Sequence, residues 1–222
     1  MIQHHPEDEW LVALAAGRLE GGQSLLVAVH LEGCAACRAR LHALQAVGGE
    51  LLAGAEPVRL ATGALDAVLA RIDATPAATT GAPAATVTAA TALPPPPPGL
   101  VWPSTLRDCA VSRWHWMGPG MRWSRLTLPY AAPGSLFLLH ISPGRSLPKH
   151  THQGVELTQV LCGTFHDGRA LFGPGDFDAT DEAIHHQPVV EPGAECVCLA
   201  YVGGRLAFDG WIASAIGRSI GM

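Results

Sequence analysis

Charged side chains are scarce in this sequence. Only 15% of the 222 residues are Asp, Glu, Lys or Arg and 6% are aromatic, whereas 48% are hydrophobic. This apolar excess provides ample material for a hydrophobic core. The chain also lacks a basic excess, because its 19 acidic and 14 basic residues give a net charge of −5. Binding to nucleic-acid phosphates requires clustered Lys and Arg, so direct nucleic-acid binding is not expected.

Long apolar runs are also missing. No stretch of roughly 18 consecutive apolar residues occurs, so the sequence predicts no membrane span. The N-terminus, MIQHHPEDEW, does not have the basic and then apolar order of a signal peptide. We therefore expect a cytoplasmic protein. In that compartment the six cysteines are expected to be thiols or metal ligands rather than disulfides.

A segment without charged or aromatic residues divides the chain. Residues 74–99 read ATPAATTGAPAATVTAATALPPPPPG, a composition that cannot bury enough apolar surface to offset chain entropy. Its five consecutive prolines predict a stiff polyproline II spacer. We therefore predict two domains, 1–73 and 100–222, joined by a flexible Ala/Thr/Pro linker over 74–99. The front domain has nine acidic and five basic residues, net −4, which suits either a basic protein partner or solubility.

The front domain is expected to be helical. The first helix should begin at Pro6, with Glu7, Asp8 and Glu9 near its positive end, and Gly17 should end it. Apolar periodicity predicts three further helices, which cover roughly 23–31, 35–52 and 62–72. The last of these has Leu65, Val68, Leu69 and Ile72 on one face. Such a one-sided helix must bury its apolar face, on its own domain or on a partner.

In the rear domain the spacing of the apolar residues changes from a helical to a β-strand pattern, and this domain is expected to be all-β. Short β-prone runs cover 136–142, 155–161, 164–172 and 196–202, with Gly/Pro/Asp turns between them. Many short strands at nearly even spacing favour an antiparallel sandwich or barrel. The predicted fold class is therefore α+β and multidomain, with a small all-α domain followed by an all-β one.

Histidine and cysteine form the first candidate metal site. His30, Cys34 and Cys37 are spaced H-x3-C-x2-C, so on a helix they lie within about 60° of one another. We expect Gly33 to break the helix between His30 and Cys34. Thiolates and imidazoles are the ligands that tetrahedral Zn²⁺ prefers, and the His4–His5 pair could supply the fourth. A structural zinc would help a domain of this size to fold, because its hydrophobic core alone is marginal.

The residues around this pattern resemble the zinc-binding anti-sigma domain of bacterial anti-sigma factors. The run HHPEDEWLVALAAGRLEGGQSLLVAVHLEGCAACRARLHALQAVGG is similar to the ChrR group in particular. The resemblance implies that His5, rather than His4, is the distal ligand beside His30, Cys34 and Cys37. It also implies a domain of three packed helices plus a fourth, which clamps an extracytoplasmic-function sigma factor and blocks its access to RNA polymerase.

The second candidate metal site lies in the rear domain. His150, His152 and Glu156 are separated by even numbers of residues, so on an extended chain they face the same side. The spacing G-x5-H-x-H-x3-E-x6-G over 144–163 matches the first motif of the cupin family at every position. The resemblance implies a cupin (jelly-roll) barrel that holds a metal ion through these side chains.

The fourth cupin ligand is less clearly marked. The segment FGPGDF over 172–177 departs from the usual second cupin motif, and the next histidines are His185 and His186. ChrR-like cupins have a His-x-Pro pattern here, which His186-Gln187-Pro188 fits, so the resemblance selects His186 and leaves His185 as the alternative. Three His and one Glu admit Zn, Mn, Fe or Ni. The resemblance favours zinc, and cupins of this kind often pair with a second copy.

Two features of the rear domain have no assigned role. Cys196 and Cys198 are predicted on one face of a strand, either as small buried hydrophobic residues or as a redox-sensitive pair. Four tryptophans before the predicted strands are expected in core or interdomain packing: Trp102, Trp114, Trp116 and Trp123.

Two functions are compatible with these sites. The first is an anti-sigma factor that releases its sigma factor when the cupin domain detects singlet oxygen or organic oxidants, as the resemblance implies. The second is a cupin dioxygenase or hydrolase with an accessory zinc domain, since fold alone does not exclude catalysis. We favour the regulator over the enzyme, because the sequence contains no further acid/base pair that would argue for catalysis.

Overall fold

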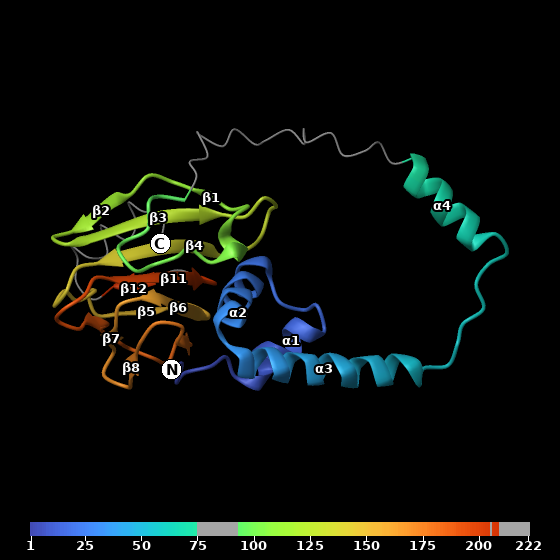
Figure 1. Cartoon of the computed structure of the whole chain (residues 1–222), viewed down its shortest axis with the longest axis horizontal. Coiled ribbons are helices and arrows are strands. Elements are labelled where there is room, and N and C mark those ends of the chain that lie inside the picture. The colour runs from blue at the N-terminus through green and yellow to red at the C-terminus, as the bar shows by residue number, and fades with distance from the viewer. Residues whose placement is uncertain (75–92, 205, 209–222) are drawn as a thin grey trace.

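The computed structural model describes residues 1–74, 93–204 and 206–208. Four helices come first, followed by a short 3₁₀ turn and twelve strands (Figure 1). The helices are α1 (Asp8–Ala15), α2 (Gly21–Gly33), α3 (Ala35–Ala53) and α4 (Ala64–Ala74). Most of the predicted linker lies outside the described residues. Within the described part of the chain, no helix has the length and apolar character needed to cross a membrane.

The strands form three antiparallel sheets. The largest sheet has the order β1-β3-β4-β11-β6-β9, with β2 paired to β3, and the smaller ones are β10-β7-β8 and β12-β5. Their bounds are β1 Ala110–Val111, β2 His115–Gly118, β3 Met121–Thr127, β4 Ser135–Ile141, β5 His150–His152, β6 Glu156–Cys162, β7 Phe165–His166, β8 Leu171–Phe172, β9 Phe177–Thr180, β10 Val189–Val190, β11 Cys196–Val202 and β12 Leu206–Phe208. The predicted α+β class, with helices followed by an all-β part, is therefore confirmed.

The large sheet is organised around β11. This strand pairs with β4 on one side and β6 on the other, and all seven of its residues are buried. A strand buried on both faces reads as a continuous apolar run. β11 is such an apolar run (CVCLAYV). One of its faces points into the barrel, and other elements of the chain cover the other face.

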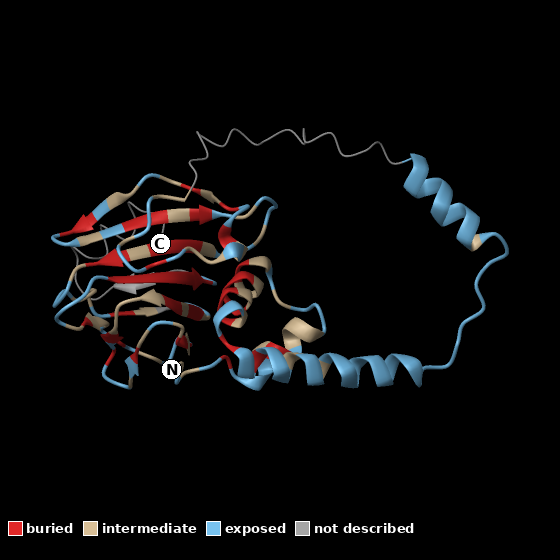
Figure 2. Ribbon diagram, viewed as in Figure 1, coloured by how far each residue is buried: buried red, intermediate tan, exposed pale blue. Residues whose placement is uncertain are grey.

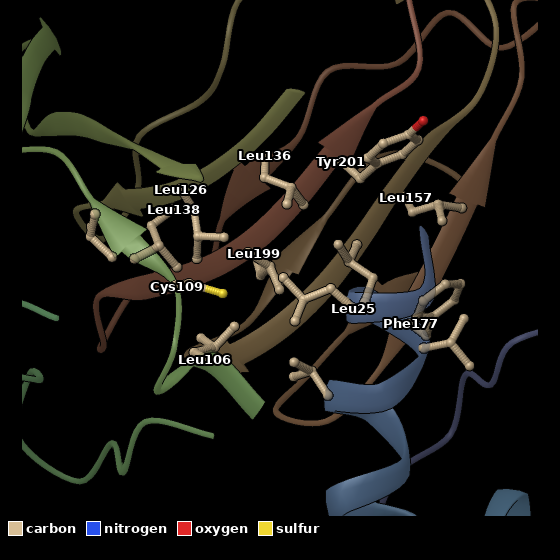
Figure 3. Packing of buried hydrophobic residues seen from close by; sticks show 14 of the residues in the cluster. Leu25, Leu106, Cys109, Leu126, Leu136, Leu138, Leu157, Phe177, Leu199 and Tyr201 are labelled. Carbon is tan, nitrogen blue, oxygen red and sulfur yellow. The ribbon is translucent and has the colours of Figure 1, made fainter. Parts of the chain in front are cut away.

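Helix α2 packs directly against this sheet, and α1 packs against α2 and α3. Leu11, Leu25 and Leu26 share one hydrophobic cluster with residues of six strands (Figure 3). The strand residues in that cluster are Val111, Leu126, Leu136, Leu138, Leu157, Phe177, Leu199 and Tyr201. The helices and the barrel are thus joined by a common core, although the sequence favoured two separate domains.

Two glycines at the start of α2 make this close packing feasible. A Cβ at Gly22 would lie 2.4 Å from the ring of Tyr201, and one at Gly21 would lie 2.8 Å from Tyr130. The Tyr201 hydroxyl donates a hydrogen bond to Glu20, which precedes the helix, at 2.7 Å. The helix therefore begins at Gly21, two residues before the predicted start, where the missing side chains let its first turn touch the sheet.

Helices α3 and α4 extend away from this core. In α3 only Cys37 is buried, and in α4 no residue is buried (Figure 2). Leu65, Val68, Leu69 and Ile72 of α4 are all exposed, at 48% or more. The amphipathic helix predicted near 62–72 is present, and its apolar face is uncovered.

Two local predictions were wrong. α1 begins at Asp8 instead of Pro6, because Glu7 has an extended backbone (ψ 161°) that continues the extended N-terminal segment. The break after α2 falls at Cys34 instead of Gly33, since Cys34 has φ −108° and ψ 99° and ends one helix while it begins the next.

Leu26→Ala tests whether helices and barrel unfold as one unit. Leu26 is completely buried in the shared core, and such truncations cost about 2–5 kcal/mol. We expect urea unfolding followed by far-UV circular dichroism and by tryptophan fluorescence to shift together. Leu51→Ala, at a site 73% exposed, should change stability by less than about 0.5 kcal/mol. Loss of the helical signal alone, with the fluorescence transition unmoved, would contradict the shared core.

Candidate metal centres

The structure brings the four predicted N-terminal donors together. One donor atom each of His5, His30, Cys34 and Cys37 lies within 4.8 Å of the others. Nδ1 of His5 is 3.4 Å from the sulfur of Cys34 and 3.4 Å from that of Cys37. His30 lies in the last turn of α2, Cys34 joins α2 to α3, and Cys37 lies in the first turn of α3. His5 reaches them from the extended N-terminal segment.

The turn between α2 and α3 fixes the positions of Cys34 and Cys37. The sulfur of Cys34 accepts a hydrogen bond from the backbone N–H of Cys37 at 3.5 Å, so it acts as the N-cap of α3. The positive end of a helix favours thiolate. Burial, together with the neighbouring Cys34, nevertheless raises the pKa of Cys37 to about 11. A cation that binds here must therefore displace protons from the sulfurs.

His30 is oriented as a metal ligand. Its Nδ1–H donates to the carbonyl oxygen of Gly175 at 3.0 Å, and because a carbonyl can only accept, this bond fixes the tautomer. Nε2 then carries the lone pair, and it is buried without a well-formed hydrogen bond among the described residues. Burial and the nearby His5 lower the pKa of His30, which favours the neutral form that binds metals. Two sulfurs and two imidazole nitrogens fit a tetrahedral zinc ion.

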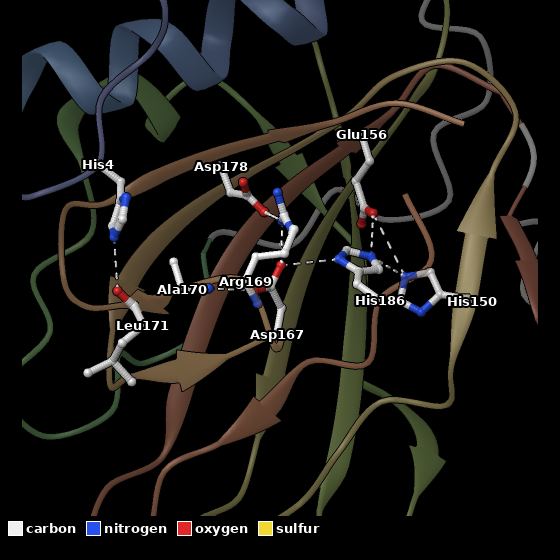
Figure 4. A network of polar contacts seen from close by, with 9 residues as sticks. All are labelled: His4, His150, Glu156, Asp167, Arg169, Ala170, Leu171, Asp178 and His186. Carbon is white, nitrogen blue, oxygen red and sulfur yellow. Dashed lines mark hydrogen bonds and ion pairs between the residues drawn. The ribbon is translucent and has the colours of Figure 1, made fainter. Parts of the chain in front are cut away.

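Three of the four predicted cupin donors also converge. His150 from β5, Glu156 from β6 and His186 from the segment after β9 place one donor atom each within 4.8 Å (Figure 4). The Nε2 atoms of His150 and His186 are 3.1 Å apart, and Nε2 of His186 is 3.3 Å from a carboxylate oxygen of Glu156. All three side chains are buried. This donor set fits one divalent cation between the histidines and the carboxylate.

Local interactions orient His150 and favour the carboxylate form of Glu156. Nδ1–H of His150 donates to the carbonyl of Pro148 at 2.8 Å, which directs Nε2 toward Glu156. Burial alone would raise the pKa of Glu156, but hydrogen bonds and charge from His150 and His186 lower it well below its ordinary range. Glu156 is therefore a carboxylate, as a metal ligand must be.

The other candidate histidines are His4, His185 and His152, and the structure places His4 and His185 outside the two donor sets. His4 donates its Nε2–H to the Leu171 carbonyl and lies against Phe172, away from the cysteines. His185 is exposed, whereas its neighbour His186 is buried among the donors. The geometry thus favours His5 and His186 over these alternatives. His152 lies on β5, but its side chain is outside what the structure describes.

A charged network behind His186 was not foreseen from the sequence. Arg169 binds Asp167 at 2.7 Å and Asp178 at 2.5 Å, and Asp167 lies 3.7 Å from Nδ1 of His186 (Figure 4). Asp167, Asp178 and His186 would resemble a third donor set, but the guanidinium already supplies the positive charge between the two carboxylates. The sequence marked 166–168 only as a turn, and no spacing linked its aspartate to residues nine or more positions away.

A small apolar cavity of about 30 Å³ adjoins the cupin donors. Glu156, His186, Cys196 and Cys198 are among its lining residues. The two cysteine sulfurs are 3.7 Å apart and buried. The hydrogen bond with Cys196 and burial both raise the pKa of Cys198. The burial of both sulfurs agrees with the interpretation as small hydrophobic residues.

Comparison with known proteins gives a consistent family. The model of the ChrR Cupin-like domain matches residues 104–204. The chain is 39% identical over 211 residues to the anti-sigma-E factor ChrR of Cereibacter sphaeroides, which covers 95% of this chain and 94% of that protein. It is also similar to ChrR in the crystal structure of Rhodobacter sphaeroides SigE in complex with the anti-sigma ChrR. There the TM-score is 0.68 and the identity 38%, over 91% of this chain and 100% of that one. This chain therefore belongs to the ChrR family of anti-sigma factors.

Proposed function

We propose that this chain binds and inhibits an extracytoplasmic-function sigma factor in the cytoplasm. The observation that carries the proposal is the similarity to ChrR crystallised with SigE, which spans the helices as well as the barrel. A relative of this kind, aligned over nearly its whole length, supports the same type of partner for this chain.

Exposed apolar surface on α3 and α4 supports a protein partner. A groove of about 520 Å³ between α1 and α3 is lined by Val12, Leu44, Val47, Leu51 and Leu52. The apolar face of α4 adds four more exposed residues. Contiguous exposed hydrophobic residues on helices mark interaction sites, and amphipathic helices commonly bind in this way. The acidic balance of the front segment suits a basic partner surface.

The two donor sets have different proposed roles. A zinc ion at His5, His30, Cys34 and Cys37 would have four protein ligands, as closed structural sites do, and would hold the N-terminal segment to the α2–α3 corner. A zinc, manganese, iron or nickel ion would be held by His150, His152, Glu156 and His186. We propose that this cupin site detects oxidants such as singlet oxygen, and that its response releases the sigma factor.

Charged substitutions on α4 test sigma binding. We expect Leu65→Glu with Leu69→Glu to abolish co-purification with the cognate sigma factor, because two carboxylates would have to be desolvated in an apolar interface. The matched control is Ala67→Glu with Ala70→Glu, which adds the same charge on the opposite face of the helix. All four sites are on a helix with no buried residue, so folding should be retained. Equal binding by both variants, or failure of the zinc-loaded wild type to bind any cognate sigma factor, would refute the proposal.

A further inference from the structure

A loop of the barrel holds the N-terminal segment in place. Residues 173–176 connect β8 to β9 and form this β8–β9 loop. One carboxylate oxygen of Asp176 accepts hydrogen bonds from the backbone N–H groups of Gln3, at 2.6 Å, and His4, at 2.9 Å. The next residue, Phe177, donates its N–H to the carbonyl of His4 at 3.1 Å. The residue immediately before His5 is therefore bound on both backbone sides by the barrel.

The same loop orients His30. The carbonyl of Gly175 accepts the Nδ1–H of His30 at 3.0 Å. Gly175 has φ +90°, and a Cβ there would lie 2.7 Å from a side-chain carbon of Ile2. Only glycine permits this backbone conformation and this close approach. The loop thus binds both the ring of His30 and the residue before His5, although it belongs to the barrel and to neither helix.

Asp176 is built for this task. It is 4% exposed, and its second carboxylate oxygen accepts the N–H of Gly173 at 2.8 Å, which fixes the turn. Burial would raise the pKa of this carboxyl, but the backbone hydrogen bonds from Gly173, His4 and Gln3 lower it below its ordinary value. An ionised carboxylate has only acceptor sites, so one oxygen can serve the loop and the other the N-terminal segment.

We propose that Asp176 and Gly175 are positioning residues of the N-terminal metal site, so that a loop of the barrel sets how tightly the helices hold their metal. This inference rests on the metal binding proposed above for His5, His30, Cys34 and Cys37. His5 is exposed and lies in a segment without helix or strand. Without the loop, its ring would have to be ordered at the moment of binding. Prior ordering of a ligand by outer hydrogen bonds strengthens metal binding.

The loop also adjoins the other donor set. β9 continues from it to Asp178, which Arg169 joins to Asp167 behind His186. The loop is therefore connected to both donor sets: it hydrogen-bonds to His30 and to the residues before His5, and it continues into the strand that carries Asp178.

Asp176→Asn in the full-length chain tests the proposal. Cobalt(II) is the probe, because thiolate-to-cobalt absorption reports on Cys34 and Cys37, and a Cys34→Ala variant identifies that band. Competition with a chelator should show cobalt held at least about ten-fold more weakly than in the wild type, the range seen for outer-shell changes. The control is Asp181→Asn, which removes the same charge from a carboxylate that caps only its own turn, through Ala183. Cobalt affinity within two-fold of the control would overturn the proposal.

Gln3→Pro removes, from the donor side, one of the two hydrogen bonds that Asp176 accepts from the N-terminal segment. Proline has no N–H to donate, and the change leaves the barrel untouched even where Asp176→Asn disturbs folding. We expect weaker cobalt binding and an altered cobalt spectrum. The double variant should bind little more weakly than Asp176→Asn alone, because both changes remove one interaction. Unchanged affinity in Gln3→Pro, or strictly additive losses, would count against the proposal. A wild type without any thiolate–cobalt band would overturn both this inference and the proposed metal site.

Discussion

Replacing Cys34 and Cys37 together by alanine should abolish inhibition of the sigma factor and remove one metal ion per chain. Both sulfurs lie 3.4 Å from Nδ1 of His5, so the double change removes half of the donor set. A structural zinc contributes roughly 10–16 kcal/mol in isolated zinc-finger peptides. Whole domains are stable by only about 5–15 kcal/mol.

The loss should be local to the corner that the metal joins. Leu11, Leu25 and Leu26 remain buried against the barrel, so α1 and α2 should keep their positions. The start of α3 depends on this corner, since Cys37 is the only buried residue of α3. We therefore expect α3 to lose its fixed direction, and with it the apolar groove between α1 and α3 that is proposed to bind the sigma factor.

A reporter driven by the sigma factor, with metal analysis of the purified chain, measures both effects. Cys109→Ala with Cys162→Ala is the matched control, because it removes two thiols that are not among the candidate donors. The control should keep repression and both metals. Full repression by a Cys34/Cys37 variant that has lost its metal would show that the zinc has no part in inhibition.

The metal-donor residues could be predicted from their spacing in the sequence, whereas the residues that hold them in place could not. His30, Cys34 and Cys37 lie within one corner of the chain, and His150 and Glu156 lie six residues apart on two consecutive strands, β5 and β6. Asp176 binds Gln3 and His4 across more than 170 residues, and nothing in its own neighbourhood marks it. A contact of this kind follows from tertiary packing, which a single sequence does not display.

The hydrophobic core that the first helices share with the barrel was not predicted, for the same reason. The sequence pointed to a 73-residue domain stabilised by zinc, but Leu26 and Val27 are buried in a core that strands far along the chain complete. β2 and β3 were not predicted, because their tryptophans obscured the alternation. Trp123 is buried, whereas Trp116 is 70% exposed, contrary to its expected place in packing. Family membership confirms the expectation of a regulator and leaves the enzyme alternative without support.

His150→Ala should separate sensing from inhibition. Nε2 of His150 lies 3.1 Å from Nε2 of His186, and 3.8 Å from a carboxylate oxygen of Glu156. The alanine removes the imidazole together with its hydrogen bond to Pro148, and one ligand position of the proposed metal site is left open. A four-ligand site that loses one histidine should bind its metal at least ten-fold more weakly, and we expect two metals per chain to fall to one.

Inhibition should survive this change, because His150 touches neither the N-terminal donors nor the exposed faces of α3 and α4. The variant should still co-purify with the sigma factor, and release should no longer follow exposure to singlet oxygen from a photosensitiser and light. His185→Ala provides the control, since this exposed neighbour of His186 is outside the donor set, and it should retain both metals and normal release. Two metals in His150→Ala would refute the cupin metal site. One metal with normal release would instead refute its role in sensing, because the detector would then have to lie elsewhere in the chain.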